Sequence, residues 1–297
     1  MAAASAAETS GSTGAVAGRR SLVVLRRLFT RPASAVGTLI VLLFLLTAAF
    51  GPMLVPYGAN QQIVSDARQA PGGSHWFGTD NLGLDVFSRV VLGARDILAL
   101  AGLGTALAVA SGTGLGLVSG YAGGWLDEVM MRFFDSLLAM PALLLSLLLL
   151  GSLGPSRNSV LLVIVVVYTP IVARVVRSVV LSVQSKAFVE AARVQGASLA
   201  RILFWEILPS TLPALAVEAA LRFSYAIFLV ASLGFLRVGV QPPSPDWGLM
   251  VKEARLFVSQ VPWAMYFPAG AIAVVVIGVN LASDGLKQAL QSDELEA

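Results

Sequence analysis

Residues 186–213 read KAFVEAARVQGASLARILFWEILPSTLP and form a polar segment between two apolar ones. Helix-favouring residues fill its first part, Gly196 interrupts them, and a second helical run ends near Pro209. The pattern predicts a short helix, a bend and an approach to the next apolar segment. A simple connector has little reason to be so ordered, so we interpret the segment as a docking element for a cytoplasmic partner. A helix lying on the membrane surface is the alternative.

The composition places this 297-residue chain among integral membrane proteins, because 57% of its residues are hydrophobic, only 12% are charged and the mean hydropathy is +0.81. The chain has no cysteine, which excludes disulfides and Cys-ligated metals, and His75 is its only histidine. A single imidazole argues against a metal site or a Ser-His-Asp triad. The net charge of +3 is too small and too scattered to indicate nucleic-acid binding.

Six apolar segments are long enough to cross a bilayer as helices, which predicts an all-α membrane protein with six transmembrane helices. They cover approximately residues 35–55, 97–119, 129–150, 159–183, 209–236 and 263–281. Residues 1–18, mostly Ala, Ser, Gly and Thr, are expected to be disordered. The first apolar segment continues through bulky leucines, so we expect it to be retained as a transmembrane helix rather than cleaved as a signal peptide.

The connecting segments divide the chain into a first unit, a core and a tail. Residues 19–96 are expected to hold the first transmembrane helix, an extracytoplasmic loop and an amphipathic interfacial helix. Residues 97–288 are expected to form a five-helix core, and residues 289–297 a cytoplasmic tail. Basic residues are more frequent on the side of the membrane that would hold both termini, which predicts that both termini are cytoplasmic.

Four residues of these segments have specific expected positions. Asp80 or Asn81 is expected to cap the interfacial helix, because both are favoured N-cap residues. His75 is expected to lie in the loop beside Trp76 at the level of the lipid headgroups. Pro141 is expected to kink the third span.

Charged residues within the apolar segments decide between classes of transporter. Glu218 and Arg222 lie four residues apart on one face of the fifth span, so we expect a structural ion pair rather than a proton relay. Asp135 is expected to pair with Arg132 or with a neighbouring helix. A secondary transporter driven by an ion gradient would need an unpaired acid within a span, for which Asp135 is the only candidate. A membrane-embedded enzyme would need a nucleophile with a base, or paired acids and histidines, and we identify neither.

The opening segment resembles the cytoplasmic EAA signature of the permease subunits of bacterial ABC importers. The residues of the matching segment are Glu190, Ala191, Ala192, Arg193, Gly196, Leu208 and Pro209. Glu206 stands where isoleucine is usual, and Ile207 follows it. The resemblance implies a coupling segment at about 186–208, between the fourth and fifth spans, whose first helix inserts into a groove of an ATPase and transmits its closure to the spans.

Two other segments are similar to the C-type permease of dipeptide, oligopeptide and nickel importers. The similar residues before the second span are Gly78, Thr79, Asp80, Gly83, Asp85 and Arg89, and those before the sixth span are Gln241, Pro242, Pro243, Trp247 and Gly248. Three positions depart from the family pattern: Leu84 stands where arginine is usual, Val230 where glutamate is usual and Arg237 where glycine is usual.

The resemblance implies the type I ABC importer permease fold, in a multi-pass protein of the bacterial inner membrane. It further implies a heterodimer with a homologous permease, two ATPase subunits that bind the ATP and magnesium, and an extracytoplasmic binding protein that delivers peptides. Nickel, glutathione or another small solute is the alternative cargo. No Gly-x-x-x-x-Gly-Lys-Ser/Thr sequence occurs, so we expect a transport subunit without a cofactor of its own rather than an enzyme.

Overall fold

The computed structural model describes residues 31–242 and 244–296, and the side chains of these residues up to 290. The predicted disordered segment 1–18 and Pro243 lie outside this part. The described helices are α2 (Pro32–Leu54), α3 (Val86–Ala122), α4 (Gly124–Leu138), α5 (Ala142–Leu153), α6 (Arg157–Val183), α7 (Ala187–Val194), α8 (Leu199–Arg201), α9 (Leu208–Phe235), α10 (Trp247–Ala254) and α11 (Trp263–Glu296). A π-helical stretch covers Ile202–Ile207, and 3₁₀ turns cover Val64–Asp66 and Arg255–Phe257.

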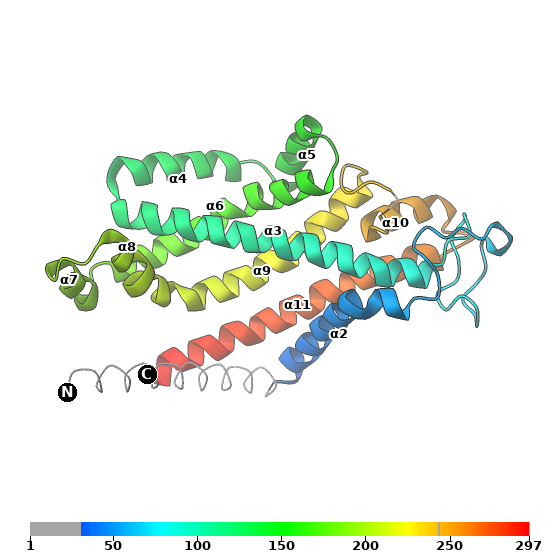
Figure 1. The fold of residues 1–297 in the computed structure, drawn as a ribbon, viewed down its shortest axis with the longest axis horizontal. Coiled ribbons are helices and arrows are strands. Elements are labelled where there is room, and N and C mark those ends of the chain that lie inside the picture. Colours follow the sequence, from blue (N-terminus) through cyan, green and yellow to red (C-terminus); the bar gives the residue numbers. More distant parts are fainter. Residues whose placement is uncertain (1–30, 243, 297) are drawn as a thin grey trace.

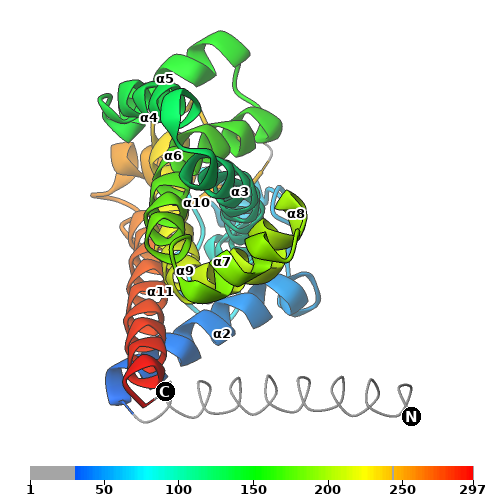
Figure 2. The same cartoon turned by 90° about the vertical axis from the view of Figure 1, so that its left-hand side faces the viewer.

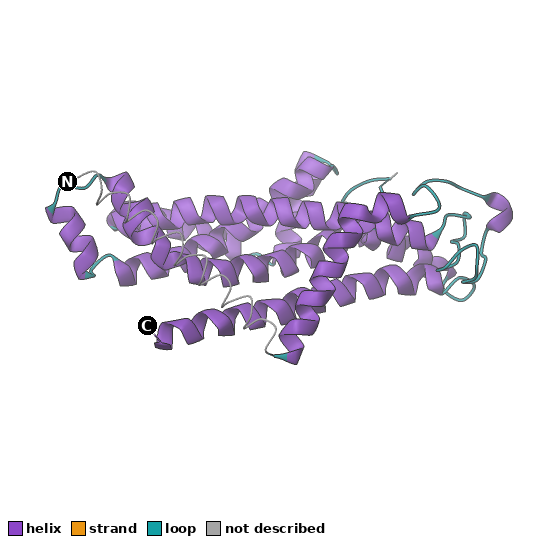
Figure 3. Cartoon of the chain, turned by 60° about the horizontal axis from the view of Figure 1, so that its bottom comes forward, coloured by secondary structure: helices purple, strands orange, loops and turns teal. Residues whose placement is uncertain are grey.

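The predicted all-α architecture is confirmed. Five helices of the described residues are long and apolar enough to cross a membrane, and α4 with α5 makes a sixth span if the bent pair is counted as one. The long helices run side by side, with α7 and α8 at one end and the loops around α10 at the other (Figures 1 and 3). We call these the α7 end and the loop end. Seen along the bundle, α4 and α5 lie on one flank, and α2 and α11 lie on the opposite flank (Figure 2).

The second span begins earlier than predicted. The expected interfacial helix and the second span are one continuous helix, α3, and neither Asp80 nor Asn81 caps it. Asp85 is the N-cap, because its Oδ2 accepts a hydrogen bond of 2.7 Å from the backbone N–H of Ser88. The apolar residues of this part of α3, including Val86, Val90 and Ala94, are buried against other parts of the protein.

The third span is interrupted more strongly than by the predicted kink. α4 and α5 meet at an angle of 92°, with Pro141 as the N-cap of α5. A proline disfavours helical conformation in the residue before it and has no N–H to donate, so the helix stops and starts again in a new direction. The segment predicted as the third span is therefore two helices with a sharp break between them.

Two further spans are continuous with neighbouring helical segments. The chain passes from α8 through the π-helical stretch into α9, so no helix ends near Pro209, which lies in the first turn of α9 instead. α11 continues from the sixth span to Glu296 without a break between the expected core and tail. The expected loop of residues 237–262 contains the short helix α10.

Small residues allow α3 and α6 to pack closely along their length. A Cβ atom built on Gly112 would lie 2.6 Å from Cβ of Val172, and one on Gly116 would lie 2.5 Å from the carbonyl oxygen of Ala173. Glycine gives helices in a membrane this close approach. The α3–α6 pair is thus the centre of the bundle, and α9 packs against both of its members.

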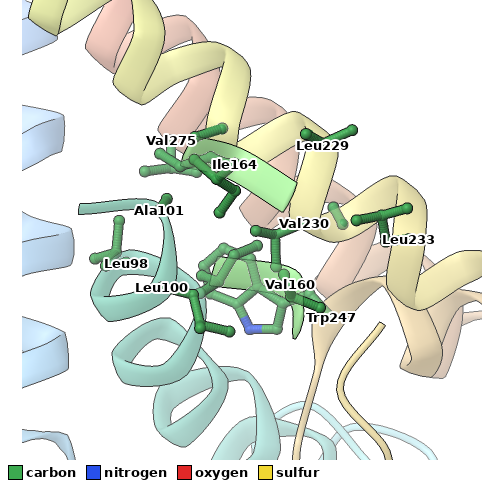
Figure 4. Packing of buried hydrophobic residues seen from close by; sticks show 14 of the residues in the cluster. Leu98, Leu100, Ala101, Val160, Ile164, Leu229, Val230, Leu233, Trp247 and Val275 are labelled. Atoms are coloured by element: carbon green, nitrogen blue, oxygen red, sulfur yellow. The ribbon is translucent and has the colours of Figure 1, made fainter. Parts of the chain in front are cut away.

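At the loop end, the core is completed by a tryptophan from α10. Trp247 is fully buried among apolar residues of α3, α6 and α9, including Leu100, Val160 and Val230 (Figure 4). This packing fixes the loop before α11 to the transmembrane bundle.

Candidate coupling segment and loop motifs

α7 presents one face to the bundle and another to the outside. On the inner face, Val189 is fully buried and Ala192 is partly buried against the ends of α6 and the π-helical stretch. On the outer face, Glu190, Ala191 and Val194 are exposed, and Val194 is 88% exposed. One acid beside small and apolar side chains makes a surface that another protein can approach closely.

Gly196 produces the predicted bend by ending α7 in a Schellman motif. Its N–H donates to the carbonyl of Arg193, and the N–H of Ala197 donates to the carbonyl of Ala192, each at 3.0 Å. The backbone of Gly196 is left-handed, with φ of +73°, and no atom lies within 4 Å of where a Cβ would be. Glycine is therefore required here for its conformation and not for lack of space.

Arg193 fastens α7 to the end of α3. Its Nε donates to the hydroxyl of Tyr121 at 3.0 Å, and its guanidinium carbon lies 4.8 Å from the centre of the Tyr121 ring. The pair combines a hydrogen bond with a cation–π contact. Tyr121 was not predicted as a site residue, since nothing in the sequence links two residues so far apart.

Leu208 and Pro209 follow the π-helical stretch directly. The N–H of Leu208 donates to the carbonyl of Leu203, five residues earlier, which is the hydrogen-bond spacing of a π-helix. Pro209 has no N–H and cannot donate the next helical hydrogen bond. The Leu-Pro pair thus stands where the connection from α7 becomes the transmembrane helix α9.

The family-like residues of the loop before α3, which we call the first loop motif, hold that loop together. Oδ1 of Asp80 accepts from the N–H groups of Leu82 and Leu84 at 2.8 and 2.9 Å, and its Oδ2 accepts from Nη1 of Arg89 at 3.2 Å. Arg89 is 7% exposed, so this ion pair joins the loop to the buried face of α3. Asp80 thus joins the backbone of the loop to Arg89 of α3.

The remaining residues of this motif have the same structural role. Gly78 and Gly83 take positive φ values of +72° and +79°. The hydroxyl of Thr79 donates to the carbonyl of Asp66 and accepts from the N–H of Gln69. The loop therefore owes its shape to its own sequence.

His75 lies in the loop, as expected, and its side chain is buried within it. It is 1% exposed, its Nδ1 lies 2.8 Å from Oδ1 of Asp85, and its Nε2 lies 3.4 Å from Oδ2 of Asp66. The ring of Tyr57 stacks on it at 4.8 Å, while the neighbouring Trp76 is 60% exposed. Hydrogen bonding to two carboxylates explains the burial of this imidazole.

The second loop motif joins α10 to the bundle. Nε1 of Trp247 donates to the carbonyl of Val90 at 2.9 Å, and a Cβ on Gly248 would lie 1.9 Å from the carbonyl oxygen of Ala231. Gly248 thus allows α10 to touch the backbone of α9.

Asp246 and Gln241 shape the turn before α10. Oδ1 of Asp246 accepts from the N–H of Leu249 at 2.8 Å, and burial raises the pKa of this carboxyl to about 6. Nε2 of Gln241 donates to two backbone carbonyls at 3.1 Å. Pro242 is exposed, and Pro243 lies outside the described residues.

The three departures from the family pattern have different surroundings. Arg237 has a positive φ of +61°, a conformation in which glycine is free of strain. Val230 is 1% exposed in the apolar core, and Leu84 forms an isolated backbone bridge with Gln62.

Three ion pairs involve charged residues of the spans. Oε1 of Glu218 lies 2.8 Å from Nε of Arg222, so the predicted contact is present. Asp135 pairs with Arg174 of α6 and not with Arg132, which pairs with Glu128 at 2.7 Å. Arg177 of α6 and Asp127 of α4 form a second pair between the same two helices. The acid that an ion-driven transporter would need free thus has a fixed partner.

Comparison with known proteins identifies the family. Residues 112–293 match the family described as the binding-protein-dependent transport system inner membrane component, and residues 22–71 match the N-terminal transmembrane domain of oligopeptide transport permease C. The chain belongs to the binding-protein-dependent inner-membrane permeases. It is therefore a multi-pass component of a membrane transport system and not an enzyme.

Relatives of this permease cover most of its length. It is 42% identical to a dipeptide transport system permease protein of Alkalihalophilus pseudofirmus, over 86% of this chain and 84% of the relative. It is 38% identical to a probable D,D-dipeptide transport system permease protein of Escherichia coli, over 87% of each chain. It is 36% identical to a glutathione transport system permease protein of Pectobacterium atrosepticum, over 89% of this chain and 88% of the relative.

Proposed function

We propose that this chain is a permease subunit of an ATP-driven peptide importer, and that an ATPase partner drives it through α7. The observation that supports this most directly is the construction of α7. It is a short helix whose outer face is exposed and whose inner face, Schellman turn and Arg193–Tyr121 contact fix it to the bundle. A helix held in this way transmits a push from a partner to the spans.

The proposed assembly contains a second, homologous permease, two ATPase subunits and an extracytoplasmic binding protein. The ATPases bind ATP and magnesium, and this chain binds neither. In the membrane, both termini and α7 face the cytoplasm, which the excess of basic residues on that side supports. The loop end then faces the binding protein.

The proposed cargo is a dipeptide or a short oligopeptide. The relatives named for dipeptide and D,D-dipeptide transport support this assignment. Glutathione, itself a peptide, is the second candidate, because other relatives of similar identity are named for its transport. Uptake of a labelled dipeptide by cells that contain the whole system, with competition by unlabelled glutathione or nickel, separates these cargoes.

The coupling role is tested by Glu190→Ala and Gly196→Asp. We expect both variants to reach the membrane at normal levels and to lose ATP-dependent uptake. Glu190→Ala removes the exposed acid of the docking face. Gly196→Asp places a residue with a side chain in a left-handed backbone conformation that favours glycine. Uptake by membrane vesicles supplied with ATP and loaded binding protein is the measurement.

Glu206→Ala is the matched control, since it removes another acid from the same segment outside the Glu-Ala-Ala run. It should retain uptake. Full uptake in both Glu190→Ala and Gly196→Asp would refute the assignment of α7 as the coupling helix.

A further inference from the structure

A cavity of about 360 Å³ opens between the broken third span, α6 and α9. Most of its wall is apolar, with side chains from both sides of the α4–α5 break. Its polar lining residues are Tyr168, Arg222 and Tyr225. Its volume lies within the range of pockets that hold small ligands.

Arg222 of α9 is part of the wall of this cavity. Its Nε contacts Glu218, which is not part of the cavity wall, at 2.8 Å. Within the described residues, the two terminal nitrogens of Arg222 make no hydrogen bond. They are not fully buried either, because fully buried nitrogens without a partner would be recognised as unsatisfied, and these two are not. The terminal nitrogens therefore keep some accessible surface, and Nε forms an ion pair with Oε1 of Glu218 that does not have the geometry of a hydrogen bond.

Two tyrosines flank the guanidinium. Its carbon lies 4.9 Å from the ring centre of Tyr225 and 5.7 Å from that of Tyr168. Aromatic faces stabilise a cation without using its hydrogen-bond donors. The two contacts and the Glu218 pair hold the charge in place within a span and leave its outer donors free.

The break of the third span adds a second favourable feature. Met140, Pro141 and Ala142 line the cavity, so the first turn of α5 lies in its wall. The first N–H groups of a helix have no partner within it and attract negative charge. Irregular backbone within a membrane is tolerated where it lines a cavity, which is the situation here.

We propose that this cavity binds a carboxylate of the peptide during its passage through the membrane. The terminal nitrogens of Arg222 form the anion site, and Tyr168 and Tyr225 form its aromatic walls. Glu218 is a positioning residue that balances the charge while the site is empty. This inference rests on the proposed function, because it requires that the chain conducts peptides.

The test uses the complete transporter in proteoliposomes, with the binding protein saturated by either a dipeptide or the same dipeptide with an amidated C-terminus. ATP hydrolysis stimulated by the loaded binding protein and peptide uptake are both measured. For Arg222→Gln we expect uptake of the free acid to fall about tenfold, because charge-assisted hydrogen bonds to the carboxylate are lost. Uptake of the amide and stimulated hydrolysis should change by less than about twofold.

Arg237→Gln is the matched control, since Arg237 follows α9 outside the cavity and is exposed, and it should leave both substrates unaffected. An equal loss for acid and amide would show a structural role of Arg222 and overturn the proposal, as would unchanged uptake of the acid. If wild-type proteoliposomes show no ATP-dependent uptake of either peptide, the proposed importer function itself is wrong.

A second measurement uses the absence of cysteine from the natural chain. In Tyr225→Cys, we expect a charged, membrane-impermeant thiol reagent to label the chain, and peptide-loaded binding protein with ATP to reduce this labelling. Phe228→Cys is the control, because Phe228 lies on the same helix and lines an apolar groove toward α11 instead. Labelling of Phe228→Cys but not of Tyr225→Cys would contradict a water-accessible site beside Arg222.

Discussion

Arg237 ends α9 with the same motif that Gly196 uses to end α7. Its N–H donates to the carbonyl of Gly234 at 3.0 Å, and the N–H of Val238 donates to that of Leu233 at 3.1 Å. The motif requires a left-handed residue, and Arg237 adopts a φ of +61° despite its side chain. Such a conformation costs a residue with a Cβ about 1 kcal/mol relative to glycine.

Arg237→Gly is therefore expected to stabilise the protein by about 0.5–1 kcal/mol. The ion pair with Glu253 at 3.3 Å is lost, but it is largely exposed and contributes less than about 1 kcal/mol. The melting temperature of the purified complex in detergent is the measurement. Arg237→Ala loses the same ion pair without relief of strain, so equal melting temperatures for the glycine and alanine variants would contradict the argument.

Single residues also mark the limit of prediction from sequence. The local requirement for glycine at position 196 was predictable, because the bend and the residue that makes it are adjacent. The partners of His75, Asp135 and Arg193 were not, because Asp66, Arg174 and Tyr121 reach them only through the tertiary fold. Residue type indicated that a partner was needed, but not which one.

At the scale of helices, apolar length predicted where the spans lie better than where they begin and end. The arginines of residues 86–96 suggested a helix on the membrane surface. In the structure, Asp80 neutralises Arg89, so this turn is buried as part of α3. Pro141 predicted an interruption, but its angle depends on what α5 packs against, which the local sequence does not contain.

The packing of α3 against α6 gives a test at this scale. Gly116→Val is expected to destabilise the protein by more than about 2 kcal/mol, because the added side chain would meet the backbone of α6 at Ala173. Gly114→Val is the control, because Gly114 lies on the same helix and no atom is within 4 Å of where its Cβ would be. Both variants replace glycine by valine, so the change in helix propensity is the same.

Melting temperature and the yield of assembled complex distinguish the two variants. Gly114→Val should lie close to the wild type, and Gly116→Val well below it. Comparable losses in both would mean that helix propensity, and not close packing, determines the need for glycine in α3.

At the scale of the whole molecule, α3 connects the two ends of the bundle. Its first turn is capped by Asp85 within the loop end, and its last turn carries Tyr121, which holds Arg193 of α7. α9 makes a second connection, since it continues from the segment after α7 to the turn before α10. We therefore expect a displacement of α7 to reach the loop end through α3 and α9, of which α9 also lines the proposed carboxylate site.

The contribution of the α3 connection is measurable with a double-mutant cycle. Tyr121→Phe removes only the hydroxyl that accepts from Arg193, and Arg193→Ala removes the guanidinium. We expect each to lower ATP-dependent uptake about threefold, and the double variant to be no worse than the poorer single one, because both remove the same contact. Arg201→Ala, an exposed arginine of the same segment, should have no effect. If the losses of the two single variants multiply in the double variant, Arg193 and Tyr121 act independently, and α9 alone transmits the movement of α7.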